Sequence, residues 1–151
     1  MSTTVSSLDE LPGLVGQHLG YSRWHRITQE QVDQFADATG DHQWIHVDPA
    51  RAAAGPFGGT IAHGYLTLSL APVLLAQILR VEGVAMGVNY GCNRVRFVSP
   101  VPVGAEVRCG ATLAGADQVD SGTQLTVDLT VELRDAPKPA CVAQVVYRYY
   151  V

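Results

Sequence analysis

The sequence has few charges and few cysteines, and each scarcity excludes a class of protein. Only 16% of the 151 residues are charged and the formal net charge is −4, whereas nucleic-acid binding relies on clustered Lys and Arg that neutralise phosphates. The three cysteines, Cys92, Cys109 and Cys141, form no CxxC pair and have no metal-like spacing. We therefore expect no nucleic-acid partner, and three buried free thiols in a reducing compartment.

No segment has the length or composition of a membrane anchor or a secretory signal. The longest apolar stretch, residues 66–79, is too short to span a bilayer and is interrupted by polar residues. Residues 1–10 lack the basic region and apolar run of a signal peptide. We expect a cytoplasmic protein that does not enter a membrane. Because no repeat or linker-like composition divides the chain, residues 1–151 are predicted to form one domain.

Two helices in the first half of the chain are predicted from their capping residues. Thr28 with Gln31 forms a capping box, and Gly40 supplies the C-terminal stop of the helix that follows. Asp48 resembles an N-cap with Pro49 at the first helical position, which predicts a second, short helix. The ten residues between these helices are therefore held at both ends.

Three further segments are predicted to form secondary structure. Residues 7–14 resemble a short capped helix and residues 21–26 a short strand. Residues 63–80 are apolar on nearly every side, and a helix of that composition should be buried. Pro72 would kink or divide this helix because proline has no backbone N–H to donate.

From Met86 onward the hydrophobic period changes to two, which is typical of strands with one buried face. The alternating stretches are 107–113, 125–134 and 141–149, with turns predicted at 115–122 and 135–139. Consecutive long strands with short turns predict an antiparallel sheet, and an all-apolar helix needs a sheet around it. The predicted class is α+β, with a curved antiparallel sheet wrapped around a long central apolar helix.

The residues suited to acid–base chemistry lie in segment 40–49, which we expect to be a loop. Asp41 and His46 stand five residues apart and can be aimed into one cavity, where they would hold one water molecule. Gly64 stands at the start of the buried helix, where a free N–H can bind an oxyanion. His42 and His46 are four residues apart, but that spacing serves a metal on a helix rather than in a loop. We expect neither a metal nor an organic cofactor.

Two ordered motifs make the sequence similar to a known family. Residues 35–46 (FADATGDHQWIH) and 61–64 (IAHG), joined by a glycine-rich loop, resemble the hydratase-2 motif of MaoC-like (R)-specific enoyl-CoA hydratases. The resemblance extends over residues 27–104. It departs from the usual Gly-Asp-x-Asn-Pro-x-His at Gln43, where Asn is usual, and at Trp44, where Pro is usual.

The resemblance implies a hot-dog fold and a reaction. In that family water is added syn to a trans-2-enoyl thioester, giving an (R)-3-hydroxyacyl thioester, or removed again. It implies that Asp41 and His46 act as general base and acid on one shared water, and that the Gly64 N–H binds the thioester oxygen. No cofactor is required. His63 is expected to be structural.

Other contacts to the substrate are expected around the same motif. Gln43, Trp44 and Tyr65 are predicted to bind the substrate beside Gly64. For Trp44, Phe57 and Tyr65 a position in an acyl pocket and a place in the ordinary core are equally compatible with the sequence.

Two alternative functions and one assembly follow from the same features. A hot-dog acyl-CoA thioesterase would use a carboxylate near the same helix start, and a non-catalytic acyl-thioester-binding subunit would have no use for both Asp41 and His46. The partner is expected to be an acyl thioester of coenzyme A or of acyl carrier protein. A homodimer is expected because exposed edge strands rarely stay unpaired. Arginines available to the carrier's phosphates are Arg94, Arg96, Arg108 and Arg148.

Overall fold

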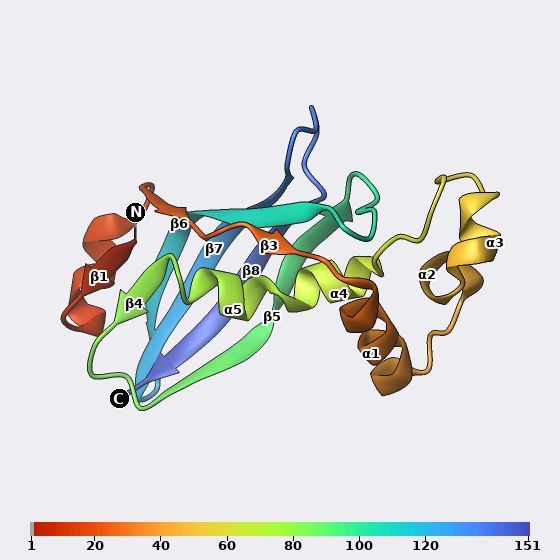
Figure 1. The fold of residues 1–151 in the computed structure, drawn as a ribbon. Helices are drawn as coiled ribbons and strands as arrows, with labels where there is room; N and C mark the ends of the chain where they lie inside the picture. Colours follow the sequence, from red (N-terminus) through yellow and green to blue (C-terminus); the bar gives the residue numbers. More distant parts are fainter. Residues whose placement is uncertain (1) are drawn as a thin grey trace.

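The computed structural model describes residues 2–151, so only Met1 of the predicted domain lies outside it (Figure 1). In chain order the elements are β1 (Thr3–Val5), the 3₁₀ helix η1 (Leu8–Leu14), β2 (His18–Tyr21), β3 (His25–Arg26), α1 (Gln29–Thr39), α2 (Trp44–Val47), α3 (Pro49–Ala53), α4 (Gly64–Ser69), α5 (Ala71–Leu75), β4 (Leu79–Val81), β5 (Met86–Phe97), β6 (Glu106–Val119), β7 (Gly122–Leu133) and β8 (Cys141–Tyr150).

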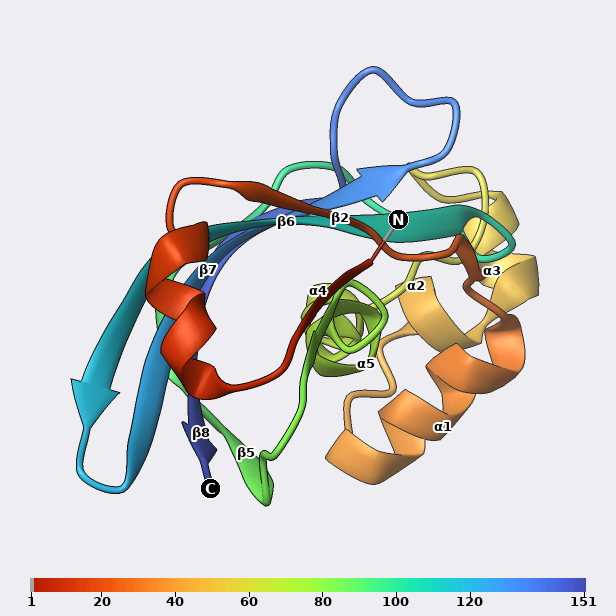
Figure 2. The ribbon, with the colours of Figure 1, turned by 90° about the vertical axis from the view of Figure 1, so that its left-hand side faces the viewer.

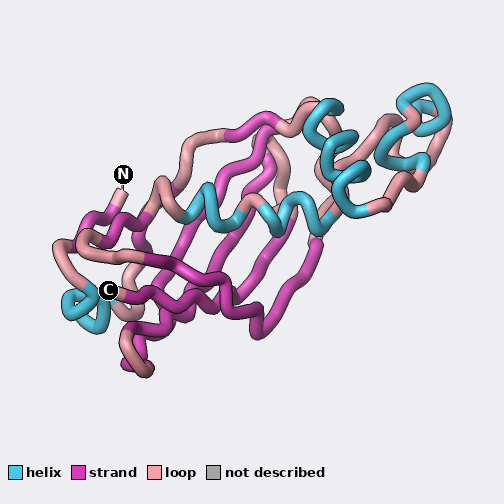
Figure 3. Tube along the Cα trace, turned by 90° about the horizontal axis from the view of Figure 1, so that it is seen from below, coloured by secondary structure: helices cyan, strands magenta, loops and turns pink. Residues whose placement is uncertain are grey.

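The main sheet is antiparallel, in the order β2-β6-β7-β8-β5, and β3 also pairs with β6. Viewed from the side in Figure 2, it curves around α4 and α5, while α1, α2 and α3 gather at one end of this central helical segment (Figure 3). The apolar sides of β6, β7 and β8 pack with the central segment in one core. The predicted α+β architecture is therefore correct, and the site-bearing helices stand at the open end of the core.

The central helix is divided at Pro72, as the sequence predicts, but it is shorter than predicted. Pro72 lies in the first turn of α5, so the helix restarts there after α4 ends at Ser69. Helix continues only to Leu75 instead of Arg80, because residues 79–81 form β4 and pair in parallel with β1. Across residues 2–151, no helix has the length and apolar composition needed to cross a membrane.

The helix ends predicted around the candidate site are confirmed, although the Thr28–Gln31 capping box is only half formed because the Gln31 side chain bonds to His25 at 3.1 Å. The Thr28 hydroxyl accepts a hydrogen bond from the Gln31 N–H at 3.2 Å, and Gly40 ends α1 in the left-handed region with φ 83°. The Asp48 carboxylate accepts from the Arg51 N–H at 3.1 Å and starts α3. These local bonds fix both ends of the segment that carries Asp41 and His46.

Two predictions near the N-terminus need correction. Residues 8–14 form a 3₁₀ helix whose N-cap, Ser7, makes no side-chain capping bond, and Glu10 instead accepts hydrogen bonds from Ser6. The predicted strand 21–26 is divided between β2 and β3, which both pair with β6.

The inward alternation of β6, β7 and β8 is confirmed, but one turn and one cysteine are not as predicted. Strands β6 and β7 pair as far as Val119 and Gly122, so the predicted turn over 115–122 shrinks to a two-residue hairpin turn. Cys109 and Cys141 are buried, and burial raises their thiol pKa values to about 12 and about 11. Cys92 is exposed, because it lies on the edge strand β5.

Candidate active site

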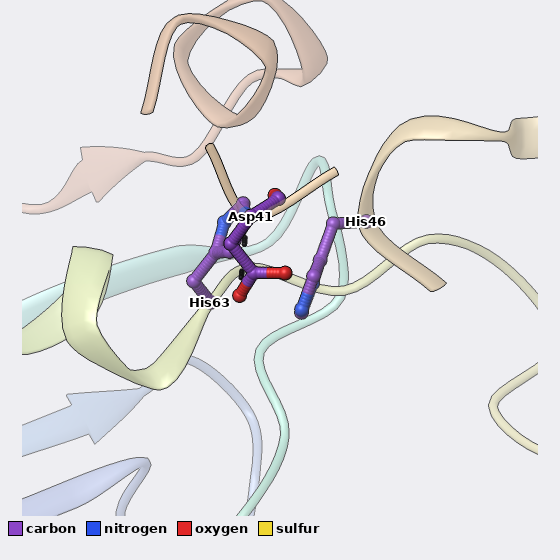
Figure 4. A group of neighbouring side chains, drawn as sticks. All are labelled: Asp41, His46 and His63. Atoms are coloured by element: carbon purple, nitrogen blue, oxygen red, sulfur yellow. Dashed lines mark hydrogen bonds and ion pairs between the residues drawn. The ribbon is translucent and has the colours of Figure 1, made fainter. Parts of the chain in front are cut away.

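Three side chains from separate elements converge at the open end of the core (Figure 4). Asp41 follows α1, His46 lies on α2, and His63 is the N-cap residue of α4. One ligand-type atom of each lies within 4.8 Å of those of the other two. The structure thus brings together the predicted pair and adds His63, which we had expected to be structural.

His46 is oriented by a backbone carbonyl. Its side chain is buried, with 6% of the residue exposed, and its Nδ1 lies 2.7 Å from the carbonyl oxygen of Ile61. A carbonyl oxygen can only accept, so Nδ1 carries the proton and a neutral ring keeps Nε2 as a free acceptor. The one-turn helix α2, in a segment that we expected to be irregular, presents the ring in this orientation.

Asp41 is held by its backbone more than by its carboxylate. Its carbonyl oxygen accepts from the His63 Nε2 at 2.9 Å, while its side chain is 54% exposed. Oδ1 accepts a long hydrogen bond of 3.4 Å from the Gln43 N–H. In Figure 4 the carboxylate lies near the two histidine rings, and the ligand-type atoms of Asp41 and His46 are within 4.8 Å of each other. A single water molecule can bridge two polar atoms at such a separation.

His63 packs between the catalytic candidates and the first helix. Its ring stacks on that of His46 with centroids 3.8 Å apart and planes 23° apart, and it lies 4.9 Å from the ring of Phe35. The sequence signal that could have assigned it to the site was its position directly before Gly64. Its contacts give it a positioning role for both Asp41 and His46.

A cavity of about 300 Å³ opens beside these groups. Its lining includes His46, Gly64, Thr67, Phe57, Phe97 and Val101. Gly64 is the first residue of α4, so its N–H has no acceptor within the helix. A Cβ at Gly64 would lie 2.9 Å from the Phe97 ring, so glycine is the residue that fits this close approach.

The other predicted substrate contacts are placed less centrally. Gln43 is exposed as the N-cap residue of α2, and Trp44 packs under the Arg51 guanidinium, 4.4 Å from its ring centroid. Tyr65 is 70% exposed, whereas Phe57 does line the cavity. Substrate binding by Gln43, Trp44 and Tyr65 stays a prediction.

His42 and His46, whose four-residue spacing suggested a metal site, do not come together as metal ligands in the structure. His42 is exposed, and its Nε2 lies 2.8 Å from a carboxylate oxygen of Asp37, a hydrogen bond that raises the pKa of His42. The group whose atoms are close enough for an ion is instead Asp41, His46 and His63. In that group His63 Nε2 and His46 Nδ1 already donate to carbonyl oxygens, which leaves one acceptor nitrogen on each ring.

The four arginines considered for phosphate binding do not form one patch. Arg108 pairs with Glu132 at 2.6 Å, and Arg148 donates to a glutamine side chain on β7. Arg94 and Arg96 are exposed on β5. These two are therefore the arginines of the four that remain suited to an anionic carrier.

Comparisons with known proteins agree with this geometry. A family model described as the MaoC like domain matches residues 10–134. The chain is 55% identical over 147 residues to 3-hydroxyacyl-thioester dehydratase Z of Mycobacterium tuberculosis, covering 97% of each protein. It is 46% identical to nodulation protein N of Rhizobium leguminosarum, covering 91% of this chain and 87% of that protein.

A solved structure supports the same assignment. The (R)-hydratase from A. caviae involved in PHA biosynthesis superposes with a TM-score of 0.72 at 28% identity, covering 88% of this chain and 94% of that one. The fold is therefore the hot-dog fold that the sequence resemblance implied. Taken with the match to the domain over most of its length, this shows that the chain belongs to the MaoC-like dehydratase family.

Proposed function

We propose that this protein is a hydro-lyase that interconverts trans-2-enoyl and (R)-3-hydroxyacyl thioesters by syn addition or loss of water. The observation that carries the proposal is the Asp41–His46 pair, which lies within the reach of one water molecule beside a cavity that contains Gly64. The 55% identical relative is named a 3-hydroxyacyl-thioester dehydratase, which supports the same reaction class.

In the hydration direction, Asp41 and His46 hold one water molecule, and the pair accepts one of its protons as the hydroxyl attacks Cβ. The free Nε2 of His46 is the suitable acceptor, because Nδ1 donates to the Ile61 carbonyl. The proton then passes from the pair to Cα on the same face. All atoms of water thus end in the product, and general acid–base help of this kind contributes about 10²–10⁴-fold.

Negative charge develops on the thioester oxygen during both steps. The N–H of Gly64 points from the first turn of α4, where a backbone donor is unused and the helix dipole is positive. Binding the thioester oxygen there would contribute about 10²–10³-fold. Gln43, Trp44 and Tyr65 would contact other parts of the substrate, and Arg94 or Arg96 the phosphates of its carrier.

The assembly we propose is a homodimer of a single-domain, cytoplasmic chain. Strand β5 stands at the sheet edge and pairs only with β8, and it is exposed along most of its length. Its apolar side chains Met86, Val88 and Tyr90 are exposed. An unpaired edge that carries exposed apolar side chains marks an association site. A second copy of the chain can pair with the β5 edge and cover its exposed apolar side chains at the same time.

A thioesterase is the alternative that the same cavity allows, since a carboxylate beside an oxyanion donor can also direct water to a carbonyl carbon. Shared water between Asp41 and the free Nε2 of His46 favours attack at the double bond instead. A subunit that only bound acyl thioesters would need neither side chain.

The test is incubation of the purified protein with trans-2-butenoyl-CoA in heavy water, followed by chiral analysis and a free-thiol assay. We expect (R)-3-hydroxybutyryl-CoA with deuterium at Cα on the same side as the hydroxyl, and no released thiol. An (S) product or released thiol would reject the reaction. Anti addition would reject the shared-water mechanism alone.

A further inference from the structure

Within residues 2–151, two buried polar side-chain atoms lack a hydrogen-bond partner, and they belong to residues four apart at the start of one helix. Among residues 2–151, the buried side-chain atoms without a partner are Nδ1 of His63 and Oγ1 of Thr67. The two residues are 3% and 2% exposed. A buried polar atom without a partner destabilises the folded protein, so each atom needs an explanation.

The two atoms are complementary in chemistry. His63 Nε2 lies 2.9 Å from the carbonyl oxygen of Asp41, which can only accept, so Nε2 carries the proton and Nδ1 of the neutral ring is an acceptor. Thr67 offers a hydroxyl proton. In helices that proton commonly goes to the carbonyl four residues back, here that of His63, but that oxygen already accepts from the N–H groups of Leu66 and Thr67.

Position favours the same pairing. Residues four apart at a helix start lie on one face, and helical side chains lean toward the N-terminus, so the Thr67 side chain leans toward His63. Thr67 also lines the cavity that His46 lines, so its hydroxyl lies at the candidate active site rather than in a remote part of the core.

We infer that Thr67 and His63 are positioning residues for the proposed reaction: one water molecule accepts from the Thr67 hydroxyl and donates to His63 Nδ1, and it fixes the tautomer whose Nε2–H holds Asp41. The inference rests on the proposed function only in its catalytic consequence. These hydrogen bonds connect the Thr67 hydroxyl, through the His63 ring, to the backbone carbonyl of Asp41. The same ring stacks on His46. One hydroxyl thus sets the relative placement of both groups that hold the water.

The test combines a spectroscopic readout with kinetics. In protein labelled with ¹⁵N-histidine, the His63 signals are assigned by their loss in His63→Gln. We expect wild-type His63 to show a protonated Nε2 and a hydrogen-bonded, unprotonated Nδ1. In Thr67→Val the Nδ1 signal should move toward that of a free acceptor nitrogen, and kcat for trans-2-butenoyl-CoA should fall about tenfold to hundredfold with little change in KM, as expected for misplaced groups.

Conservative and control variants complete the design. Thr67→Ser should restore both the Nδ1 signal and kcat. Thr67→Ala provides a second variant without the hydroxyl if valine does not pack. Ser69→Ala is the matched control, because that exposed hydroxyl on the same helix bonds to the Tyr65 carbonyl and should not change either readout.

Three results would overturn the inference. These are a proton on His63 Nδ1 in the wild type, an unchanged His63 spectrum in Thr67→Val, or a loss of kcat that serine does not restore. Because the spectrum is recorded without substrate, it tests the pairing even if the protein proves not to be a hydratase. Loss of activity with an unchanged spectrum would assign the hydroxyl to the substrate instead of to His63.

Discussion

The imidazole of His46 is held at two places, by the Ile61 carbonyl at Nδ1 and by the stacked ring of His63, and both contacts leave Nε2 free. Asp41 has the opposite arrangement, since its backbone is fixed through His63 while its carboxylate stays half exposed. A fixed acceptor nitrogen beside a half-exposed carboxylate suits a pair that must first bind a neutral water molecule and then share its proton.

At this scale we predict that Asp41→Asn and His46→Gln each fold normally and lose about 10²–10⁴-fold in turnover. The double variant should lose little more than the worse single variant, because two residues that hold one water act as a unit. Hydration of trans-2-butenoyl-CoA, with circular dichroism as the folding check, measures both statements.

His42→Gln is the matched control, since it changes an exposed histidine of the same segment that bonds to Asp37. It should retain turnover. Near-wild-type activity in both Asp41→Asn and His46→Gln would show that the pair is not the catalytic group.

At the scale of elements, α1 and α3 act as two fixed ends for the segment that carries the pair. Gly40 is the decisive residue, because Asp41 follows it directly and the chain turns there with φ 83°. A Cβ built at Gly40 meets no atom within 4 Å, so crowding is not what requires glycine. Backbone conformation alone requires it.

We predict that Gly40→Ala lowers the free energy of unfolding by about 1 kcal/mol, since a left-handed conformation costs an L-residue about 1–2 kcal/mol and alanine regains part through the unfolded chain. It should also lower kcat, because relief of that strain moves Asp41. Gly40→Asn should lose less of both, as asparagine tolerates this conformation. Chemical denaturation and steady-state kinetics provide the measurements.

Gly13→Ala is the control for this prediction, because a Cβ at Gly13 also meets nothing and its φ is not positive. It should leave kcat within error and should not lower the free energy of unfolding, because alanine at an unstrained position only restricts the unfolded chain. Equal stability losses in Gly13→Ala and Gly40→Ala would refute the conformational argument.

At the scale of the whole molecule, the sheet edge formed by β5 has no neighbouring strand within the described residues. Within residues 2–151, strand β5 has a neighbour on one side only, and its apolar side chains Met86, Val88 and Tyr90 are exposed. Pairing two copies through β5 would join the sheets edge to edge about a two-fold axis, which is the symmetry most often found in soluble oligomers.

We predict that the protein sediments as a dimer at micromolar concentration and that Val88→Lys shifts it to monomer, because a charged side chain on an edge strand opposes pairing. Val15→Lys is the matched control. Val15 is exposed to a similar extent, 43% against 39%, but its neighbour Gly16 bonds to Leu113 of β6, away from the β5 edge. A monomeric wild type, or dissociation by both variants, would contradict an interface at β5.

The sequence by itself determined the features that rest on local chemistry. Thr28, Gly40 and Asp48 are read correctly because a cap involves residues at most a few positions apart. The alternation of β7 is read correctly because it follows from one buried face. Asp41, His46 and Gly64 were proposed as site residues because each family motif that carries them is contiguous in the chain.

Tertiary structure alone decided the features that depend on partners distant in sequence. The segment 79–81 became a strand because β1 offers it an edge, and the β6–β7 hairpin lengthened because each strand pairs with the other to its end. His63 joined the site because its Nε2 meets a carbonyl 22 residues away, and Cys92 stayed exposed because β5 ends the sheet. Contacts of this range leave no periodic trace in the sequence, since they arise only when the chain is packed.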